Sequence, residues 1–285
     1  MEYKVKLKEI GFEITKKCNF GCIHCYLEKN SKQELDIDFI KNFIVNFGDD
    51  FNTIYITGGE PLCHKNFLEI FKLIIKSGYF TMLFTNASMF TEDIFNEFKK
   101  NIPHKIKISI YGMSDETYNK VTHRRGMFKQ VIRNIQILKS FNANISLKFI
   151  LLNENKRDLK QFLSFSKKNN LPYTIYTNML PIIDENNNLL NLTLSSDHLK
   201  SIFQEAQIYN YNEKSQNCNF CDAGKNIFID SGSILRGCPV LKTKYDCPVS
   251  NISNNIKFNN IRDKIATYCK DKPSCPAFLN LQESV

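Results

Sequence analysis

A regular alternation of strand-like and helix-like segments along residues 8–178 constrains the fold of this chain more than any other feature. Strand patterns occur at 8–15, 52–57, 79–85, 105–111, 145–151 and 173–178. Apolar residues at helical spacing predict helices at 35–47, 64–77, 127–140, after the N-cap residue Thr91, and around Leu159, Phe162 and Leu163. Strands that alternate with helices pair in parallel through right-handed crossovers. The sequence therefore predicts an α/β fold with its active site at the carboxyl ends of parallel strands.

The predicted strands have one apolar and one polar face. In the fourth strand Ile106 and Ile108 alternate with Lys107 and Ser109. A closed eight-stranded barrel fills its interior with branched apolar side chains, so polar inner faces favour an open, partial (βα)6 TIM-like barrel. The polar residues predicted to line its substrate cavity are Glu13, Tyr55, Lys107 and Lys148. The alternative is that these groups form ion pairs at the barrel floor.

The length of 285 residues allows one barrel-sized domain with a small appendage. We expect the barrel over residues 1–180. The stretch 181–216 reads as a connection with a bridging helix at 197–209, because a proline and an asparagine run precede an apolar helical pattern. Residues 217–285 then form a small C-terminal domain with a hairpin and a helix near 258–268.

The composition indicates in which compartment the protein works and which kinds of partner it has. The first residues lack the apolar segment of a secretory signal, and no apolar run reaches the length of a membrane span. We therefore expect a cytoplasmic protein without membrane contact, whose ten cysteines are reduced. The net charge of +9 comes from dispersed lysines without a basic run of five, so the pattern favours a solvated surface over nucleic-acid binding.

Three cysteines follow the first predicted strand within eight residues. Cys18, Cys22 and Cys25 form a Cys-x3-Cys-x2-Cys array in the segment KCNFGCIHCY. A structural zinc site closes its tetrahedron with four protein ligands, whereas three thiolates on a cubane iron–sulfur cluster leave one iron open. The alternative is a zinc knuckle that takes His24 or Cys63 as its fourth ligand. Otherwise, Cys63 is expected to be a small buried apolar residue.

The array resembles the cluster loop of the radical S-adenosylmethionine (SAM) superfamily, in which the open iron of a [4Fe-4S] cluster chelates SAM. Gly58, Gly59 and Glu60 in the segment TGGEP resemble the family's motif for the SAM amino group. The resemblance covers residues 8–180 and implies cleavage of SAM to a 5'-deoxyadenosyl radical that abstracts hydrogen from a substrate. It also implies an electron donor such as flavodoxin or ferredoxin.

Further positions resemble SAM contacts of the family. His24 corresponds to a position near the adenine. The remaining positions, which resemble contacts to the ribose and carboxylate, are Asn86, Ser109 and either Arg124 or Arg125.

Six cysteines lie in the tail. Cys-x2-Cys, a hairpin around Ser231-Gly232 and a further cysteine resemble the twitch domain, a short form of the SPASM extension that binds auxiliary clusters. The resemblance implies one auxiliary [4Fe-4S] cluster, with the expected ligands Cys218, Cys221, Cys238 and Cys275. Cys247 and Cys269 could replace an outer ligand or donate hydrogen to a substrate radical. A four-cysteine zinc ribbon is the alternative.

The stretch from Ser109 to Phe128 resembles family members that modify peptides. It implies a ribosomally made precursor peptide as substrate, which would be crosslinked, given a thioether or epimerised. Because no peptide-recognition domain precedes the barrel, the peptide would dock directly or through a separate recognition protein. The alternative is a small-molecule enzyme resembling the molybdenum-cofactor GTP cyclase. A binding module with a purely structural cluster is a third option, which would not need Glu60 or the glycines.

Overall fold

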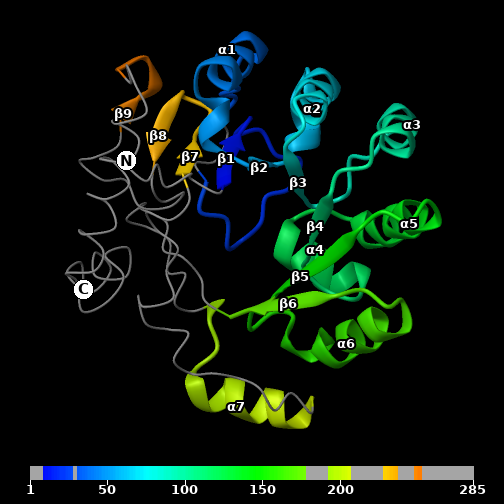
Figure 1. Cartoon of the computed structure of the whole chain (residues 1–285). Coiled ribbons are helices and arrows are strands. Elements are labelled where there is room, and N and C mark those ends of the chain that lie inside the picture. Colours follow the sequence, from blue (N-terminus) through cyan, green and yellow to red (C-terminus); the bar gives the residue numbers. More distant parts are fainter. Residues whose placement is uncertain (1–8, 28–30, 178–191, 207–226, 237–246, 252–285) are drawn as a thin grey trace, which may run out of the picture.

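The computed structural model describes residues 9–27, 31–177, 192–206, 227–236 and 247–251. In this part of the chain one curved sheet has the strand order β6-β5-β4-β3-β2-β1-β7-β8-β9 (Figure 1). The first six strands pair in parallel in the order of the sequence. They are β1 (Glu9–Glu13), β2 (Thr53–Thr57), β3 (Phe80–Thr85), β4 (Lys105–Ile110), β5 (Ile145–Ile150) and β6 (Tyr173–Tyr176). This arrangement confirms the predicted partial barrel.

Helices alternate with these strands and follow the outer side of the curved sheet (Figure 1). They are α1 (Ile37–Phe47), α2 (Phe67–Lys76), α3 (Glu92–Lys100), α5 (Met127–Ser140) and α6 (Leu159–Lys168). As predicted, Thr91 caps α3, accepting a hydrogen bond from the N–H of Ile94. The bridging helix is present as α7 (Ser196–Glu205). Short 3-10 turns lie at Gly48–Asp50, Pro61–Cys63, Lys156–Asp158 and Val249–Asn251.

One further helix, α4 (Asp115–Thr122), was not predicted. Ser114 caps it by accepting from the N–H of Thr117, and His123 ends it in the left-handed conformation. Its short apolar stripe, Tyr118 and Val121, is fully buried. The helix lies within the stretch Ser109–Phe128 and supports the cysteine loop, as described below.

The core lies between the sheet and the outer helices because the apolar faces of the strands point that way. Phe12 of β1 meets Phe43 of α1 with ring centroids 5.5 Å apart, and Phe149 of β5 stacks on Phe162 of α6 at 4.5 Å. All four side chains are buried. This burial of aromatic area on one face fixes the strands with their other face turned away from the helices.

That other face, here called the inner face, carries the predicted cavity residues. Paired residues of neighbouring strands share a face, and the register pairs Glu13 with Thr57, and Ser109 with Lys148. Tyr55 and Lys107 alternate with outward isoleucines of β2 and β4. The four predicted residues therefore lie on one face, as expected.

The predicted hairpin is present and extends the same sheet. β7 (Ile227–Ile229) and β8 (Ile234–Arg236) are antiparallel, and β9 (Cys247–Pro248) pairs with β8. The unexpected feature is that β7 pairs in parallel with β1. Gly11 permits this packing, because a Cβ there would lie 2.2 Å from the Tyr55 ring, which in turn contacts Phe228 of β7. The domain boundaries at 180 and 217 stay a prediction.

Candidate active site at the carboxyl ends of the strands

The cysteine loop follows β1 and is held by α4. The N–H groups of Gly21 and Ile23 donate to the carbonyls of Thr122 and Val121 at 2.9 and 3.0 Å. Within the described residues all the cysteines are free thiols, and the three of the loop are coupled to one another electrostatically. The end of α4, about 100 residues farther along the chain, therefore holds the cysteine loop in its shape.

Aromatic rings enclose the inner side of this loop. Phe20, His24 and Tyr118 all contact the ring of Tyr111, with centroids 5.4 to 6.1 Å apart. Burial in these surroundings, together with the nearby Glu60, raises the pKa of Cys18 to about 12, although a hydrogen bond from the N–H of Phe20 lowers it in part. Thiolates at this position therefore need positive charge, which a bound metal centre supplies.

The donor set fits an iron–sulfur cluster. Three free thiols occupy one loop, and the hydroxyl of Tyr118 and Nδ1 of His24 are buried there without a hydrogen-bond partner. Unpartnered buried polar atoms are uncommon, so these two face a site that a further group completes. Among the described residues, no three His, Cys, Asp or Glu side chains are arranged to hold a single metal ion.

The two glycines of the TGGEP segment bring two pieces of backbone together. The N–H of Gly59 donates to the carbonyl of Thr15, and the N–H of Glu60 donates to the carbonyl of Lys17, both at 2.8 Å. A Cβ on Gly58 would lie 2.4 Å from the Thr15 oxygen. The glycines therefore let the motif pair with the segment that enters the cysteine loop. The sequence had predicted only that they would let the backbone approach a bound ligand.

Glu60 is fully buried, and its carboxylate already accepts three hydrogen bonds. Oε1 accepts from Thr85 Oγ1 at 2.6 Å and from the N–H of Leu62 at 3.2 Å, while Oε2 accepts from the N–H of Asn86 at 2.7 Å. Burial raises the pKa of Glu60 to about 7, and the three hydrogen bonds partly offset that rise. Glu60 thus ties the motif to the end of β3, and Oε2 keeps one acceptor position.

Asn19, which sequence reasoning missed, joins two of the predicted positions. Its Oδ1 accepts from Asn86 Nδ2 at 3.0 Å, and its carbonyl accepts from Nε of Arg124 at 2.6 Å. The signal for Asn19 was only its place between Cys18 and Cys22. Both arginines are exposed, and Arg124 contacts the loop through this hydrogen bond.

The inner face continues from this loop across the sheet. Ser109 is half-buried and hydrogen-bonds Tyr111. Glu13 accepts from Ser231 Oγ of the β7–β8 turn at 3.1 Å, and burial raises its pKa. The turn is itself braced by the ion pair between Asp230 and Arg236 at 2.6 Å. The hairpin therefore touches the end of β1 directly before the cysteine loop.

Few of the tail cysteines can be placed. Cys218, Cys221, Cys238, Cys269 and Cys275 lie outside the described residues, as does the helix expected near 258–268. Cys247 is half-buried on β9, where its thiol donates to the carbonyl of Pro248 at 3.3 Å. Cys63 is also half-buried, and it is electrostatically coupled to Cys18.

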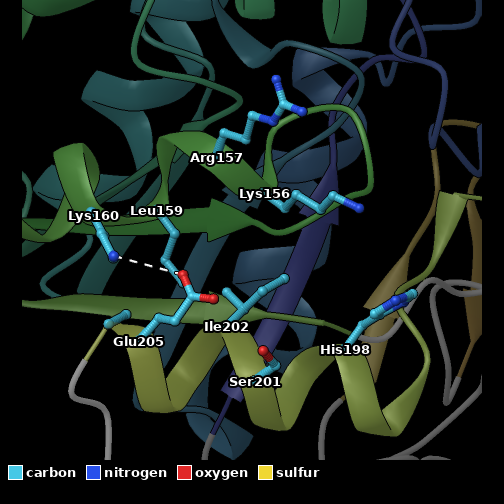
Figure 2. A pocket seen from close by; sticks show the side chains of 9 residues that line it. Lys156, Arg157, Leu159, Lys160, His198, Ser201, Ile202 and Glu205 are labelled. Atoms are coloured by element: carbon cyan, nitrogen blue, oxygen red, sulfur yellow. Dashed lines mark ion pairs between the residues drawn. The ribbon is translucent and has the colours of Figure 1, made fainter.

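A separate cavity of about 370 Å³ lies between α6 and α7 (Figure 2). Lys160 of α6 and Glu205 of α7 form an ion pair across it at 3.6 Å. Its other basic lining residues are Lys156, Arg157 and His198. It contains none of the predicted site residues.

A sequence model described as the radical SAM superfamily matches residues 12–166, which include the cysteine loop, the glycines and α4. The chain belongs to the radical SAM superfamily. This confirms that it is a radical SAM enzyme with a [4Fe-4S] cluster and SAM as cofactors.

None of the helices in the described part of the chain is long and apolar enough to cross a membrane.

Two relatives by sequence differ in how much of the chain they match. An uncharacterized protein of Methanocaldococcus jannaschii is 23% identical over 284 residues, which cover 90% of this chain and 94% of that protein. A probable GTP 3',8-cyclase of Saccharolobus islandicus is 25% identical over 167 residues, which cover 56% of this chain and 53% of the cyclase. The chain thus matches about half the length of the cyclases.

Solved structures share the fold over most of the chain. Streptococcus suis SuiB bound to precursor peptide SuiA has a TM-score of 0.66 and 10% identity, covering 90% of this chain and 67% of SuiB. The protein anSMEcpe with bound AdoMet and Cp18Cys peptide has a TM-score of 0.72 and 13% identity, covering 93% and 84%. At these identities the similarity shows the fold alone.

Proposed function

We propose that this radical SAM enzyme acts on a ribosomally made peptide, installing a crosslink, a thioether or an inverted centre. The observation that carries the proposal is the extent of the fold similarity. It spans 90% and 93% of the chain in two structures that contain a bound peptide, whereas the sequence similarity to a probable GTP cyclase covers 56%. An open sheet with a polar inner face suits an extended, polar substrate.

The residues have distinct proposed roles. Cys18, Cys22 and Cys25 hold the cluster, and Gly58 to Glu60 with Asn86 form the wall that binds SAM. When bound, the cluster and SAM supply a carbon radical that removes hydrogen from an unactivated carbon. The rings of His24 and Tyr111 exclude water from that position, which prevents side reactions of a radical.

Further SAM contacts come from the neighbouring strand and helix. Ser109 lies on the inner face of β4, while Arg124 is held to the cysteine loop through Asn19. A guanidinium fixed in this way can pair with the SAM carboxylate. Arg125 takes this part only if Arg124 serves the loop alone.

For the tail we propose one auxiliary [4Fe-4S] cluster held by Cys218, Cys221, Cys238 and Cys275. Cys247 and Cys269 are then either ligands or hydrogen donors. Single alanine variants distinguish these roles, because loss of a ligand lowers the iron content, whereas loss of a donor blocks deuterium uptake from heavy water into the product. Normal iron and normal product in both variants would exclude both roles.

The second candidate is a small-molecule enzyme similar to GTP cyclases. The observation in its favour is the 25% identity to a probable GTP 3',8-cyclase over 167 residues. The spacing of Cys218, Cys221 and Cys238 also resembles the tail of that enzyme, with a longer interval.

One experiment separates the two candidates. The anaerobically reconstituted enzyme is incubated with SAM, a reduced flavodoxin or ferredoxin, and either GTP or short peptides encoded beside its gene. Mass spectrometry should find a peptide that has changed mass, or has gained deuterium in heavy water, together with 5'-deoxyadenosine. Conversion of GTP with every peptide unchanged would overturn the peptide proposal. A peptide that reacts only after a second protein is added would identify a separate recognition protein.

A further inference from the structure

Two lysines stand side by side on the inner face, on neighbouring strands. Lys107 lies on β4 and Lys148 on β5, where the register pairs Ser109 with Lys148 and Lys107 with Ser146. The two side chains are half-buried, and the positive charge of Lys107 acts on Lys148. Lys148 also acts electrostatically on His24 of the cysteine loop, which puts this lysine near the site where SAM is expected.

Aromatic rings, not carboxylates, are the close neighbours of both ammonium groups. Nζ of Lys107 lies 4.9 Å from the centroid of Phe84, and Nζ of Lys148 lies 3.9 Å from the centroid of Tyr176. Neither lysine forms an ion pair with another described residue, although Glu9 exerts a favourable charge on Lys107 from farther away. Two adjacent like charges in a partly dry site are costly unless an anion joins them.

The cost is visible in the ionisation of Lys148. Burial, and then the charge of Lys107, lower its pKa from 10.5 to about 8. A cation–π contact offsets such burial only in part. Because ion-paired lysines occur elsewhere on this chain, for example Lys17 with Glu34 at 2.9 Å, the lack of a carboxylate ion-pair partner for Lys107 and Lys148 among the described residues is a local feature.

From this geometry we infer that Lys107 and Lys148 together bind an anionic group of the substrate, a carboxylate or a phosphate, and so position the substrate beside SAM. The inference rests on the proposed function. It adds to that function a substrate class: a peptide with an acidic side chain or carboxyl terminus at the reacting end, or a nucleotide with its phosphates on the lysines. The contacts of the two ammonium groups with the rings of Phe84 and Tyr176 hold the lysines in place for either anion.

The test uses the full, reconstituted enzyme saturated with SAM and three probes in titration calorimetry. The probes are inorganic tripolyphosphate, an acetylated pentaglutamate, and the matched pentaglutamine. The variants are Lys107→Met, Lys148→Met and their combination, which keep apolar stems, and Lys148→Arg, which keeps the charge. Lys105→Met is the matched control, because Lys105 lies on the same face of β4 two residues farther from the carboxyl end.

We expect one anionic probe to bind, and the neutral peptide not to bind. Each single Met variant should weaken that binding about tenfold and the double variant more, whereas Lys148→Arg and Lys105→Met should bind nearly as the wild type does. The phosphate and carboxylate probes identify which source of the anion the site prefers. Higher salt should weaken binding in the wild type more than in the double variant.

Three results would overturn the inference. The first is that neither anionic probe binds the wild type, and the second is that the probe binds the double variant as well as the wild type. The third is that SAM affinity falls in parallel, which would assign the lysines to the SAM carboxylate. Substrate-free SAM cleavage, which should be unchanged in the control Lys105→Met, shows that a substitution on this face of β4 leaves the fold and the cofactor site intact. An absence of SAM cleavage in the wild type would instead refute the proposed function.

Discussion

Replacing Gly59 by alanine should disturb the cysteine loop without touching a cysteine. The added Cβ would lie 2.5 Å from the Lys17 carbonyl and 2.7 Å from that of Lys16, about 0.9 Å short of an ordinary 3.4 Å contact. Both oxygens belong to the backbone, so the segment that enters the loop must move. Overpacking of this kind costs about 1–3 kcal/mol. Weakening of the hydrogen bond from Gly59 to Thr15 adds about 1 kcal/mol.

Gly21→Ala is the matched control. Gly21 lies inside the cysteine loop, but the nearest atoms to its added Cβ are 3.8 and 3.9 Å away. Urea unfolding of the apoproteins should show a loss of about 2–4 kcal/mol for Gly59→Ala and little change for Gly21→Ala. Iron content and SAM cleavage after reconstitution should fall only in Gly59→Ala. Equal stability and equal iron in the two variants would refute the view that these glycines serve backbone contact.

Three further predictions follow from the same region. Replacing Cys18, Cys22 and Cys25 together by alanine should remove about four irons per chain and all formation of 5'-deoxyadenosine, and residual cleavage would contradict their assignment. In the folded apoprotein the pKa of Glu60 is about 7, against 4.5 in the unfolded chain. Between these pH values the folded state binds more protons than the unfolded state, so the free energy of unfolding falls as the pH rises. Glu60→Gln should reduce this pH dependence of the free energy of unfolding, measured by urea unfolding. An unchanged pH dependence would contradict the role given to Glu60. Lys148→Met should raise the free energy of unfolding at pH 7 by about 1–3 kcal/mol, because it removes a partly buried charge. The gain should persist below about pH 8 and vanish near pH 10.5, and a loss at pH 7 would contradict the argument.

Local patterns predicted most of the barrel because its helices and strands bury continuous apolar faces. The helix Met127–Ser140 matches its predicted bounds, and the others differ by a few residues at their ends. The helix Asp115–Thr122 escaped because it is short and only three of its side chains are buried. Its signal was the cap, Ser114 followed by two acidic residues, rather than apolar periodicity.

The candidate site was predictable as a set of motifs but not as a network. The cysteine spacing and the TGGEP segment indicated the family, which the sequence model confirms. The contacts of Glu60 with Thr85, and of Asn19 with Asn86, join segments 25 and 67 residues apart. No periodicity encodes such pairs, because they depend on how parallel strands place their ends together.

The parallel pairing of β1 with β7 has a consequence for synthesis on the ribosome. Residues Ile10 to Phe12 leave the ribosome more than two hundred residues before their partners Ile227 to Ile229. Until then one side of the first strand is an unpaired edge of a growing sheet, and such edges template aggregation. Closing so long a loop is also slow. Nascent chains that stop after Tyr176 should therefore need chaperone protection that the released protein does not.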